Sequence, residues 1–175
     1  METTHLILRK MQESDAADFF AYAKNVEVGP RAGWQPHQDE QETVQIMRQV
    51  FLGRENTYGI IDKKTKRLIG TIGLASDPLR TNDMAQALGY SIAREYWGKG
   101  YTTEAAKAVL EDVFVNKKLP FITATHYRGN QGSKRVIEKC HFQYEGTLRQ
   151  AEKRYDGAVF DLCCYSLSRE EYLRQ

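Results

Sequence analysis

Hydrophobic residues recur along the N-terminal half of the chain with two different periods. Alternation of apolar and polar positions predicts a strand over residues 5–9, and the short segments 58–62 and 68–74 are predicted strands as well. The polar segment 63–66 lies between the last two and predicts the turn of a hairpin. These elements indicate an antiparallel meander early in the chain.

Helical spacing of apolar residues appears in two segments between these strands. The first covers residues 15–24, for which Ser14 is the predicted N-cap, and the second covers residues 39–52. A loop that contains Gly29-Pro30 separates them. The residues predicted to face inward are Ala16, Phe19, Phe20 and Ala23 in the first helix, and Val44, Met47, Val50 and Phe51 in the second.

The C-terminal half alternates strands and helices. Strands are predicted over residues 84–92, 121–125, 144–154 and 159–167, and Asp156-Gly157 is a tight turn between the last two. One helix spans residues 102–115, and another begins at the cap Asn130 and ends near Cys140. The buried stripe predicted for the first of these helices is Ala105, Ala106, Val109, Leu110, Val113 and Phe114.

This order predicts an α/β (α+β) fold with helices around one mixed sheet. A length of 175 residues predicts a single domain over residues 1–175. Hydrophobic residues at 41% and charged residues at 27% indicate a globular protein rather than a disordered one. No apolar run approaches the ~20 residues needed to cross a bilayer, and residues 1–10 lack a signal-peptide core.

Charge and cysteine content narrow the possible partners. Lys and Arg number 25 against 23 Asp and Glu, which argues against a broad nucleic-acid face or a membrane patch. The three cysteines, Cys140, Cys163 and Cys164, form neither a disulfide framework nor a Cys-x-x-Cys metal pair. We therefore expect structural thiols, no metal and a cytoplasmic location.

The segment 88–106 is the most informative one for chemistry. A strand runs into a loop with Gly98 and Gly100, and this loop leads directly into an amphipathic helix. Free N–H groups at a helix start, the helix dipole and glycines that allow close approach together favour phosphate binding. Lys99 adds a cation, and Thr102 adds a hydroxyl group. Neither a P-loop nor a complete dinucleotide fingerprint is present, and a plain tight turn is the alternative interpretation.

The same segment resembles the acetyl-CoA-binding motif of the GNAT N-acetyltransferase superfamily. The resemblance is closest to the RimJ/RimL-like branch of ribosomal-protein N-terminal acetyltransferases. It extends to residues 130–142 and to Glu145-Gly146, and it covers nearly the whole chain from residue 5 onward. It implies the GNAT fold, in which helices flank a mixed, mostly antiparallel central sheet.

The resemblance also implies a set of coenzyme A contacts. The pyrophosphate would be bound by the loop, the pantetheine arm by the strand end before it, and the lower part of the cofactor by the start of the later helix. A simple helix cap at Asn130 and a solvated lysine at Lys134 are the alternatives. The implied residues are Trp97, Gly98, Lys99, Gly100, Tyr101 and Thr102 in the loop, Ser91, Ile92 and Ala93 in the strand, and Asn130, Ser133 and Lys134 in the helix.

Proton transfer needs further groups, because acetyl transfer requires a neutral amine. The resemblance points to Glu152 as general base and to Ser133 as hydrogen-bond donor to the coenzyme A thiolate. His126 is a second candidate base or substrate contact, and Trp34 is a candidate lining residue of the acceptor pocket. The alternatives are an exposed strand glutamate, a structural histidine and a core tryptophan.

The sequence departs from the family pattern at four positions, one of which is His141, where a glycine is common. Glu95 stands where Gln or Arg is common, Ala87 where many relatives carry a glutamate, and Ile137 where many carry a tyrosine acid. The last two departures keep a non-catalytic acyl-CoA-binding module open as an alternative.

The function expected from the resemblance is acetyl-CoA-dependent N-acetylation of a primary amine by direct attack in a ternary complex. A protein N-terminal α-amine is one acceptor, and a polyamine, an antibiotic or an amino acid is the alternative. A backbone N–H near Ile92 would serve as the oxyanion hole. Monomer and homodimer both remain open.

Overall fold

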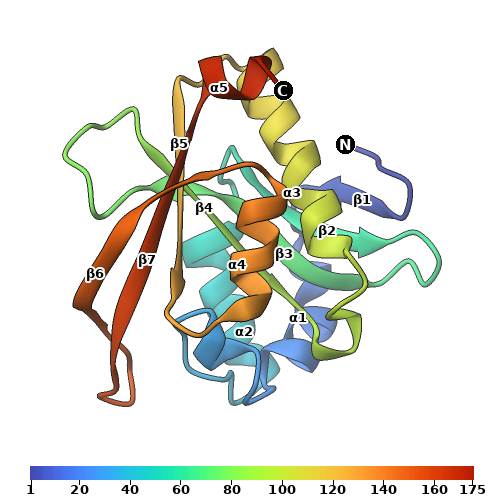
Figure 1. Ribbon diagram of the computed structural model, residues 1–175. Helices are drawn as coiled ribbons and strands as arrows, with labels where there is room; N and C mark the ends of the chain where they lie inside the picture. The colour runs from blue at the N-terminus through green and yellow to red at the C-terminus, as the bar shows by residue number, and fades with distance from the viewer. The chain divides into compact units, whose positions relative to one another are not determined.

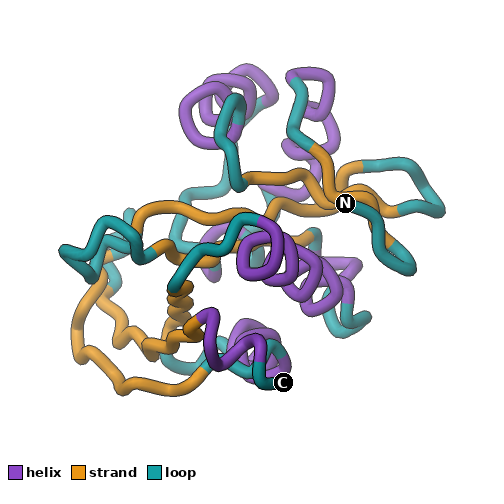
Figure 2. The backbone as a smooth tube through the Cα atoms, turned by 90° about the horizontal axis from the view of Figure 1, so that it is seen from above, coloured by secondary structure: helices purple, strands orange, loops and turns teal.

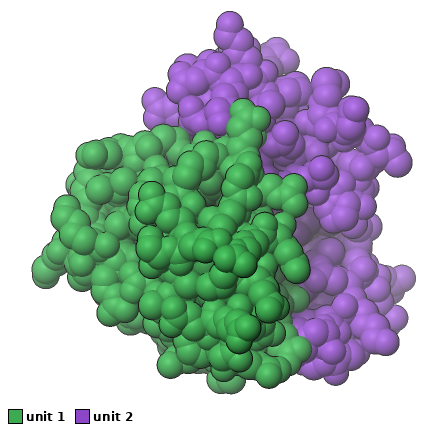
Figure 3. Space-filling model, turned by 180° about the vertical axis from the view of Figure 1, so that it is seen from behind, with its two compact units in different colours: residues 1–73, 90–105 green, residues 74–89, 106–175 purple.

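The computed structural model describes residues 1–175, and the chain folds into two compact units (Figure 3). Unit 1 comprises residues 1–73 and 90–105, and unit 2 comprises residues 74–89 and 106–175. Strands β3 (Leu68–Ser76) and β4 (Gln86–Ile92) and helix α3 (Tyr101–Glu111) each contribute residues to both units. The strand order is β1-β2-β3-β4-β5-β7-β6, which confirms the predicted mixed sheet.

Unit 1 begins with an antiparallel arrangement of short strands (Figure 1). Strand β1 (Leu6–Arg9) pairs with β2 (Thr57–Asp62), which pairs with β3. Gly70 is required here, because a β-carbon at that position would lie 2.5 Å from the Ser91 carbonyl oxygen of β4. The glycine therefore allows the close approach of β3 and β4 that positions the end of β4.

Two helices connect β1 to β2 and complete the core of unit 1. Helix α1 (Ala16–Ala23) follows a 3-10 turn at Glu13–Asp15. Helix α2 (Glu40–Ile46) is capped by the Asp39 carboxylate, which accepts the Glu42 N–H at 2.7 Å, and it continues into a π turn at Met47–Phe51. A further 3-10 turn at Gly29–Arg31 lies between the two helices. The fully buried members of this core include Leu6, Leu8, Phe19, Met47 and Ile60.

Unit 2 contains a parallel strand pair and a long antiparallel ribbon. Strand β4 runs parallel to β5 (Phe121–Tyr127), which is antiparallel to β7 (Val159–Ser168). Strand β7 forms the ribbon with β6 (Gln143–Lys153), clearly visible in Figure 1. Helix α4 (Gln131–Lys139) follows β5 in the chain, and α5 (Arg169–Leu173) follows β7 and leads to the C-terminus; Figure 2 shows all helices in purple and all strands in orange.

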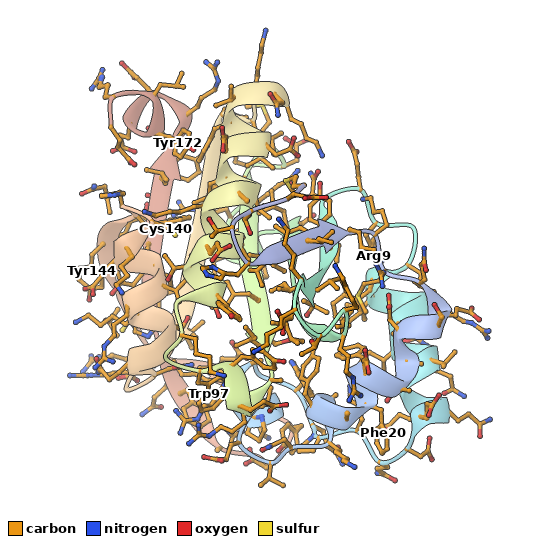
Figure 4. All side chains as sticks on the ribbon, turned by 90° about the vertical axis from the view of Figure 1, so that its right-hand side faces the viewer. Arg9, Phe20, Trp97, Cys140, Tyr144 and Tyr172 are labelled. Carbon is orange, nitrogen blue, oxygen red and sulfur yellow. The ribbon has the colours of Figure 1, made fainter.

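Helix α3 confirms its predicted stripe. The residues Ala105, Ala106, Val109, Leu110, Val113 and Phe114 are all buried. In unit 2 the stripe ends at Phe114, whose ring lies 4.9 Å from that of Tyr172 in α5 (labelled in Figure 4). The helical spacing of apolar residues therefore predicted this helix correctly.

Several local predictions were wrong. Ser14 does not cap α1; the Asp15 carboxylate instead accepts the Gln12 N–H at 2.8 Å, because the helix is preceded by a 3-10 turn. Tyr22 is buried in α1, whereas Phe20 is half-buried. Val50 is exposed, because the π turn after α2 changes the helical spacing. The terminal helix α5 was not predicted, although Ser168 accepts the Glu171 N–H as its cap.

Candidate functional site

The loop predicted to bind pyrophosphate joins the end of β4 to the start of α3 within unit 1. A 3-10 turn at Arg94–Tyr96 precedes it, and α3 begins at Tyr101. Gly98 has φ +74° and Gly100 has φ +83°, both in the left-handed region that favours glycine. The two glycines therefore make the turn that brings the chain directly into the helix.

This turn lies beside open space and leads into backbone N–H groups at the start of α3 that have no helical partner. A β-carbon placed on Gly98 or Gly100 would meet no atom within 4 Å. The first backbone bond into the helix joins the Glu104 N–H to the Gly100 carbonyl at 3.0 Å, which leaves the N–H groups of Tyr101 and Thr102 without a carbonyl partner. An anion of the size of a phosphate fits a cradle of this kind.

Trp97 anchors the loop to the end of β4. Its indole N–H donates to the Ile92 carbonyl at 2.9 Å, and Figure 4 shows it beside the coil that leads into α3. The guanidinium groups of Arg94 and Arg31 lie over the Trp97 ring at 4.6 and 5.0 Å. Sequence analysis missed these two cations, of which Arg94 also forms an ion pair with Glu27, with 3.1 Å between Nε and Oε2. Cation–π contact with the tryptophan holds them beside the loop.

The strand end at Ser91 to Ala93 is fixed by bonds within unit 1. The Ser91 hydroxyl lies 3.2 Å from the Tyr22 hydroxyl and 3.0 Å from that of Thr71, and burial raises the pKa of Tyr22. The Ala93 N–H donates to the Ile69 carbonyl at 2.8 Å. The Ser91 side chain and the Ala93 N–H are therefore both engaged, so a pantetheine arm would pair with other backbone groups of this segment.

In unit 2, Glu152 is held by a residue that sequence analysis did not select. The Tyr127 hydroxyl donates to Glu152 Oε1 at 2.5 Å, across the intervening strand β7. Burial and then the Glu152 carboxylate raise the pKa of Tyr127. The Tyr127 ring also stacks on Phe160 with 4.6 Å between ring centroids. Glu152 is thus an oriented carboxylate rather than a freely rotating strand side chain.

A β-bulge sets the position of Glu152. The register of β6 against β7 shifts between Leu148 and Glu152, so that Glu152 pairs with Phe160. Gln150 within the bulge has φ +51°, and its N–H donates to Asp161 Oδ1 at 2.9 Å. Bulges re-aim the side chains that follow them. A regular alternation along β6 therefore cannot predict where the Glu152 side chain lies.

The start of α4 has the capping geometry that the sequence indicated. The Asn130 side chain accepts the Ser133 N–H at 3.2 Å. Lys134 forms an ion pair with Glu138 one turn later, with 3.7 Å between Nζ and Oε1. Ile137 is fully buried. The cap is confirmed, and the coenzyme A roles of Asn130, Ser133 and Lys134 stay predictions.

His126 and Trp34 are both engaged in packing. His126 is buried in unit 2, and its Nε2 lies 3.3 Å from the Tyr165 hydroxyl. Trp34 is half-buried in unit 1 against the core, with its ring 5.1 Å from that of His37. His37 itself is buried, and its Nδ1 lies 2.9 Å from the Thr43 hydroxyl. These contacts agree with the structural interpretation that the sequence left open for His126 and Trp34.

The candidate residues thus fall into two groups by unit. Unit 1 contains Trp34, residues 91–93 and the loop 97–102, whereas unit 2 contains His126, the start of α4 and Glu152. The cysteines are free thiols, and burial raises the pKa of Cys140 to about 11. No helix has the length and apolarity to span a bilayer, and no cluster of His, Cys, Asp or Glu is arranged to hold a metal ion.

Comparison with known proteins gives consistent relatives. The family described as acetyltransferase (GNAT) domain matches residues 5–143. An uncharacterised N-acetyltransferase, p20 of Bacillus licheniformis, is 31% identical over 97% of this chain and 96% of its own length. The [ribosomal protein uS5]-alanine N-acetyltransferase of Escherichia coli is 27% identical over 83% of this chain and 79% of its own length.

Solved structures share the fold at lower sequence identity. A GNAT-family acetyltransferase from Bacillus anthracis superposes with a TM-score of 0.86 at 24% identity, over 98% of this chain and 99% of that one. Spermidine N-acetyltransferase from Vibrio cholerae, solved in complex with CoA and spermine, has a TM-score of 0.80 at 20% identity, over 98% and 99% of the two chains.

Proposed function

The chain belongs to the GNAT acetyltransferase family and is an N-acetyltransferase, and from this premise we propose that it transfers the acetyl group of acetyl-CoA to a protein N-terminal α-amine. The observation that carries the cofactor part is the cradle at Gly98 and Gly100. Two positive-φ glycines, unpaired N–H groups and open space at a helix start suit the coenzyme A pyrophosphate.

The residues that would hold acetyl-CoA follow from the local geometry. The backbone of Gly98 to Thr102 binds the pyrophosphate, and Lys99 adds its charge. Backbone groups of Ser91 and Ile92 other than the Ile92 carbonyl, which accepts the Trp97 indole N–H, pair with the pantetheine arm. The start of α4, at Asn130, Ser133 and Lys134, contacts the remainder of the cofactor. Acetyl-CoA supplies an activated acetyl group whose leaving thiolate is a stable anion.

Glu152 acts as the general base in this proposal. A carboxylate that accepts the proton of the attacking ammonium leaves the neutral amine needed for reaction. The amine nitrogen then bonds to the acetyl carbonyl carbon, the carbon–sulfur bond breaks, and the sulfur leaves as thiolate. The second proton that the nitrogen loses on becoming an amide passes to this thiolate, so that coenzyme A leaves as the thiol. Ser133 donates a hydrogen bond to that sulfur, and a backbone N–H near Ile92 stabilises the oxyanion. The Tyr127 bond that orients Glu152 supports its assignment as base.

An α-amine suits this machinery better than a lysine side chain. Its pKa of about 8 leaves part of it neutral at physiological pH, whereas lysine at about 10.4 is almost fully charged. One base is then sufficient, and the relative that acts on the alanine of ribosomal protein uS5 supports this acceptor class. Polyamines form the competing class, because a structural neighbour is a spermidine acetyltransferase.

The test has two stages, both on the full chain. Calorimetric titration with acetyl-CoA should give saturable one-site binding, and ATP should not compete. Purified protein with acetyl-CoA should then acetylate the α-amine of peptides that begin with alanine, detected by mass spectrometry. The matched control is the same peptide with a blocked N-terminus and a free lysine. Acetylation of spermidine instead of every peptide would overturn the acceptor, and absence of acetyl-CoA binding would overturn the cofactor assignment.

A further inference from the structure

The N-terminal segment of unit 1 contacts the first turn of α3, which the sequence analysis did not connect to it. Both oxygens of the Glu104 carboxylate are engaged by this segment. Oε1 accepts the Thr3 hydroxyl at 2.5 Å and the His5 N–H at 2.7 Å, and Oε2 lies 2.8 Å from His5 Nδ1. A carboxylate only accepts hydrogen bonds, so Nδ1 carries a proton and donates it.

The same contact supports the loop through a row of aromatic rings. The His5 ring is stacked on Tyr101, the first residue of α3, with centroids 5.4 Å apart. Tyr101 in turn lies 5.9 Å from Tyr96, over which the Lys99 ammonium is placed at 4.8 Å. The N-terminal segment therefore stacks on the first residue of α3, and Tyr101 in turn contacts Tyr96 on the other side of the glycine turn.

The placement of Glu104 poses an electrostatic problem for anion binding. Burial tends to raise the pKa of Glu104, but the bonds from Thr3 and His5 outweigh it, so the pKa lies below its usual value and the group is ionised. Helical side chains point back toward the helix N-terminus. A negative charge in the first turn of α3 would therefore compete with a phosphate for the same N–H groups.

We propose that Thr3 and His5 are positioning residues for acetyl-CoA, because they hold the Glu104 carboxylate away from the N–H groups that bind the pyrophosphate. The inference rests on the proposed function of the loop but concerns residues outside it. Four features carry it: both carboxylate oxygens are engaged, the partners come from one segment, that segment stacks on Tyr101, and the N–H groups themselves are unpaired. We call these bonds from Thr3 and His5 to Glu104 the clamp. Without the clamp, the Glu104 carboxylate is free to move toward the N–H groups at the start of α3.

The experiment measures acetyl-CoA affinity by calorimetry in the wild-type protein and in a series of variants. The double variant Thr3→Val/His5→Phe removes two side-chain donors while it keeps the β-branched side chain and the ring stacked on Tyr101. We expect its Kd for acetyl-CoA to rise roughly 3- to 10-fold, in the range of surface charge effects at a helix start. Adding Glu104→Gln to the double variant should restore Kd to within about twofold of wild type, because it removes the released charge.

Controls separate this role from simple loss of packing. Glu104→Gln alone should bind acetyl-CoA about as tightly as wild type, and the weakening in the double variant should shrink at high salt. Glu40→Gln provides a matched loss of charge in the first turn of α2 and should leave Kd unchanged. The single variant His5→Phe provides the same comparison if the double variant unfolds. A double variant that binds like wild type, or one that Glu104→Gln fails to rescue, would overturn the clamp; a wild-type protein that does not bind would overturn the proposed function itself.

Discussion

The Tyr127 phenol donates a hydrogen bond to the Glu152 carboxylate, and the two residues reach each other across strand β7. The Tyr127 ring is stacked on Phe160, which pairs with Glu152 in the neighbouring strand, so ring and carboxylate are fixed together. The Arg154 guanidinium lies over the Phe160 ring, 4.8 Å from the ring centroid, and forms an ion pair with Asp156. If Glu152 is the base, Tyr127 acts through it.

We therefore predict that Tyr127→Phe lowers kcat by about tenfold and leaves the KM for acetyl-CoA unchanged, since a hydrogen bond to a charged group contributes about 1.5–3 kcal/mol. The measurement is steady-state kinetics in a double-mutant cycle with Glu152→Gln. The phenol should have almost no further effect once the carboxylate is gone.

The control for this cycle is Tyr165→Phe, which removes a different buried hydroxyl in unit 2, the partner of His126. It should leave kcat close to the wild-type value. Equal losses from Tyr127→Phe in the wild-type and Glu152→Gln backgrounds would show that Tyr127 has only a structural role.

The elements and the glycine turn before α3 were predictable because their signals are local. The stripe of α3 follows from apolar residues at helical spacing, and all of its members are buried. Gly98 and Gly100 mark a turn that requires positive φ. The Asn130 cap follows from a side chain that accepts an N–H three residues later. In each case the residues that make the signal are neighbours in the sequence.

The contacts that orient the site were not predictable, because they depend on register and on distant segments. The position of Glu152 results from a bulge between Leu148 and Glu152, which breaks the alternation that strand prediction uses. Thr3 and Glu104 are separated by about a hundred residues, and nothing in either segment identifies the other. Val50 was misplaced for a related reason, because a π turn shifts its side chain out of the helical period.

The glycine turn makes a prediction about acetyl-CoA binding. Gly98→Ala and Gly100→Ala should each lower stability by about 1 kcal/mol, because an L-residue at positive φ is strained. Each should also weaken acetyl-CoA binding by roughly tenfold, because the added methyl group and the shifted backbone disturb the N–H cradle. Calorimetry and thermal unfolding measure the two effects.

Gly53 offers a matched control for the glycine variants. It has φ +74°, and a β-carbon there would also meet nothing within 4 Å. Gly53→Ala should therefore show a similar loss of stability with an unchanged Kd for acetyl-CoA. Equal weakening of acetyl-CoA binding in all three variants would contradict a specific role of the loop.

The burial of His37 should make the free energy of unfolding depend on pH. Burial lowers the pKa of His37 below 6.5, and this effect exceeds that of the nearby Glu42 carboxylate, which favours the charged form. The unfolded chain therefore takes up a proton more readily than the folded one as the pH falls below about 6.5. The contribution of neutral His37 to the free energy of unfolding is therefore fully present above that pH, and it declines as the solution becomes more acidic.

Urea unfolding at a series of pH values between neutral and mildly acidic measures this dependence. His37→Gln should reduce the slope of unfolding free energy against pH. A slope that is the same in His37→Gln and wild type would assign the pH dependence to other groups.

Substitution of the buried Asp77 should lower the free energy of unfolding substantially. Its side chain is 4% exposed, accepts the Thr123 hydroxyl at 2.8 Å and the Leu79 N–H at 2.9 Å, and lies 3.2 Å from the Arg80 guanidinium. Arg80 also pairs with Glu145, so Asp77 connects the loop after β3 to both β5 and β6. Asp77→Ala leaves the buried Thr123 hydroxyl without its acceptor and removes one of the two carboxylates that pair with Arg80, which should cost about 2 kcal/mol in unfolding free energy.

Denaturant unfolding should show this loss as a lower midpoint at an unchanged slope. Asp77→Asn keeps an acceptor for Thr123 and should lose less, because only the ion pair with Arg80 is removed. Arg128→Ala is the surface control: Arg128 is largely exposed and its partner Asp161 lies 3.3 Å away, so solvent screens the pair and the midpoint should scarcely move. If Asp77→Ala and Arg128→Ala shift the midpoint equally, the connection of β3 to β5 and β6 does not depend on the buried Asp77 carboxylate. In that case, packing of apolar side chains must hold the loop after β3 in place.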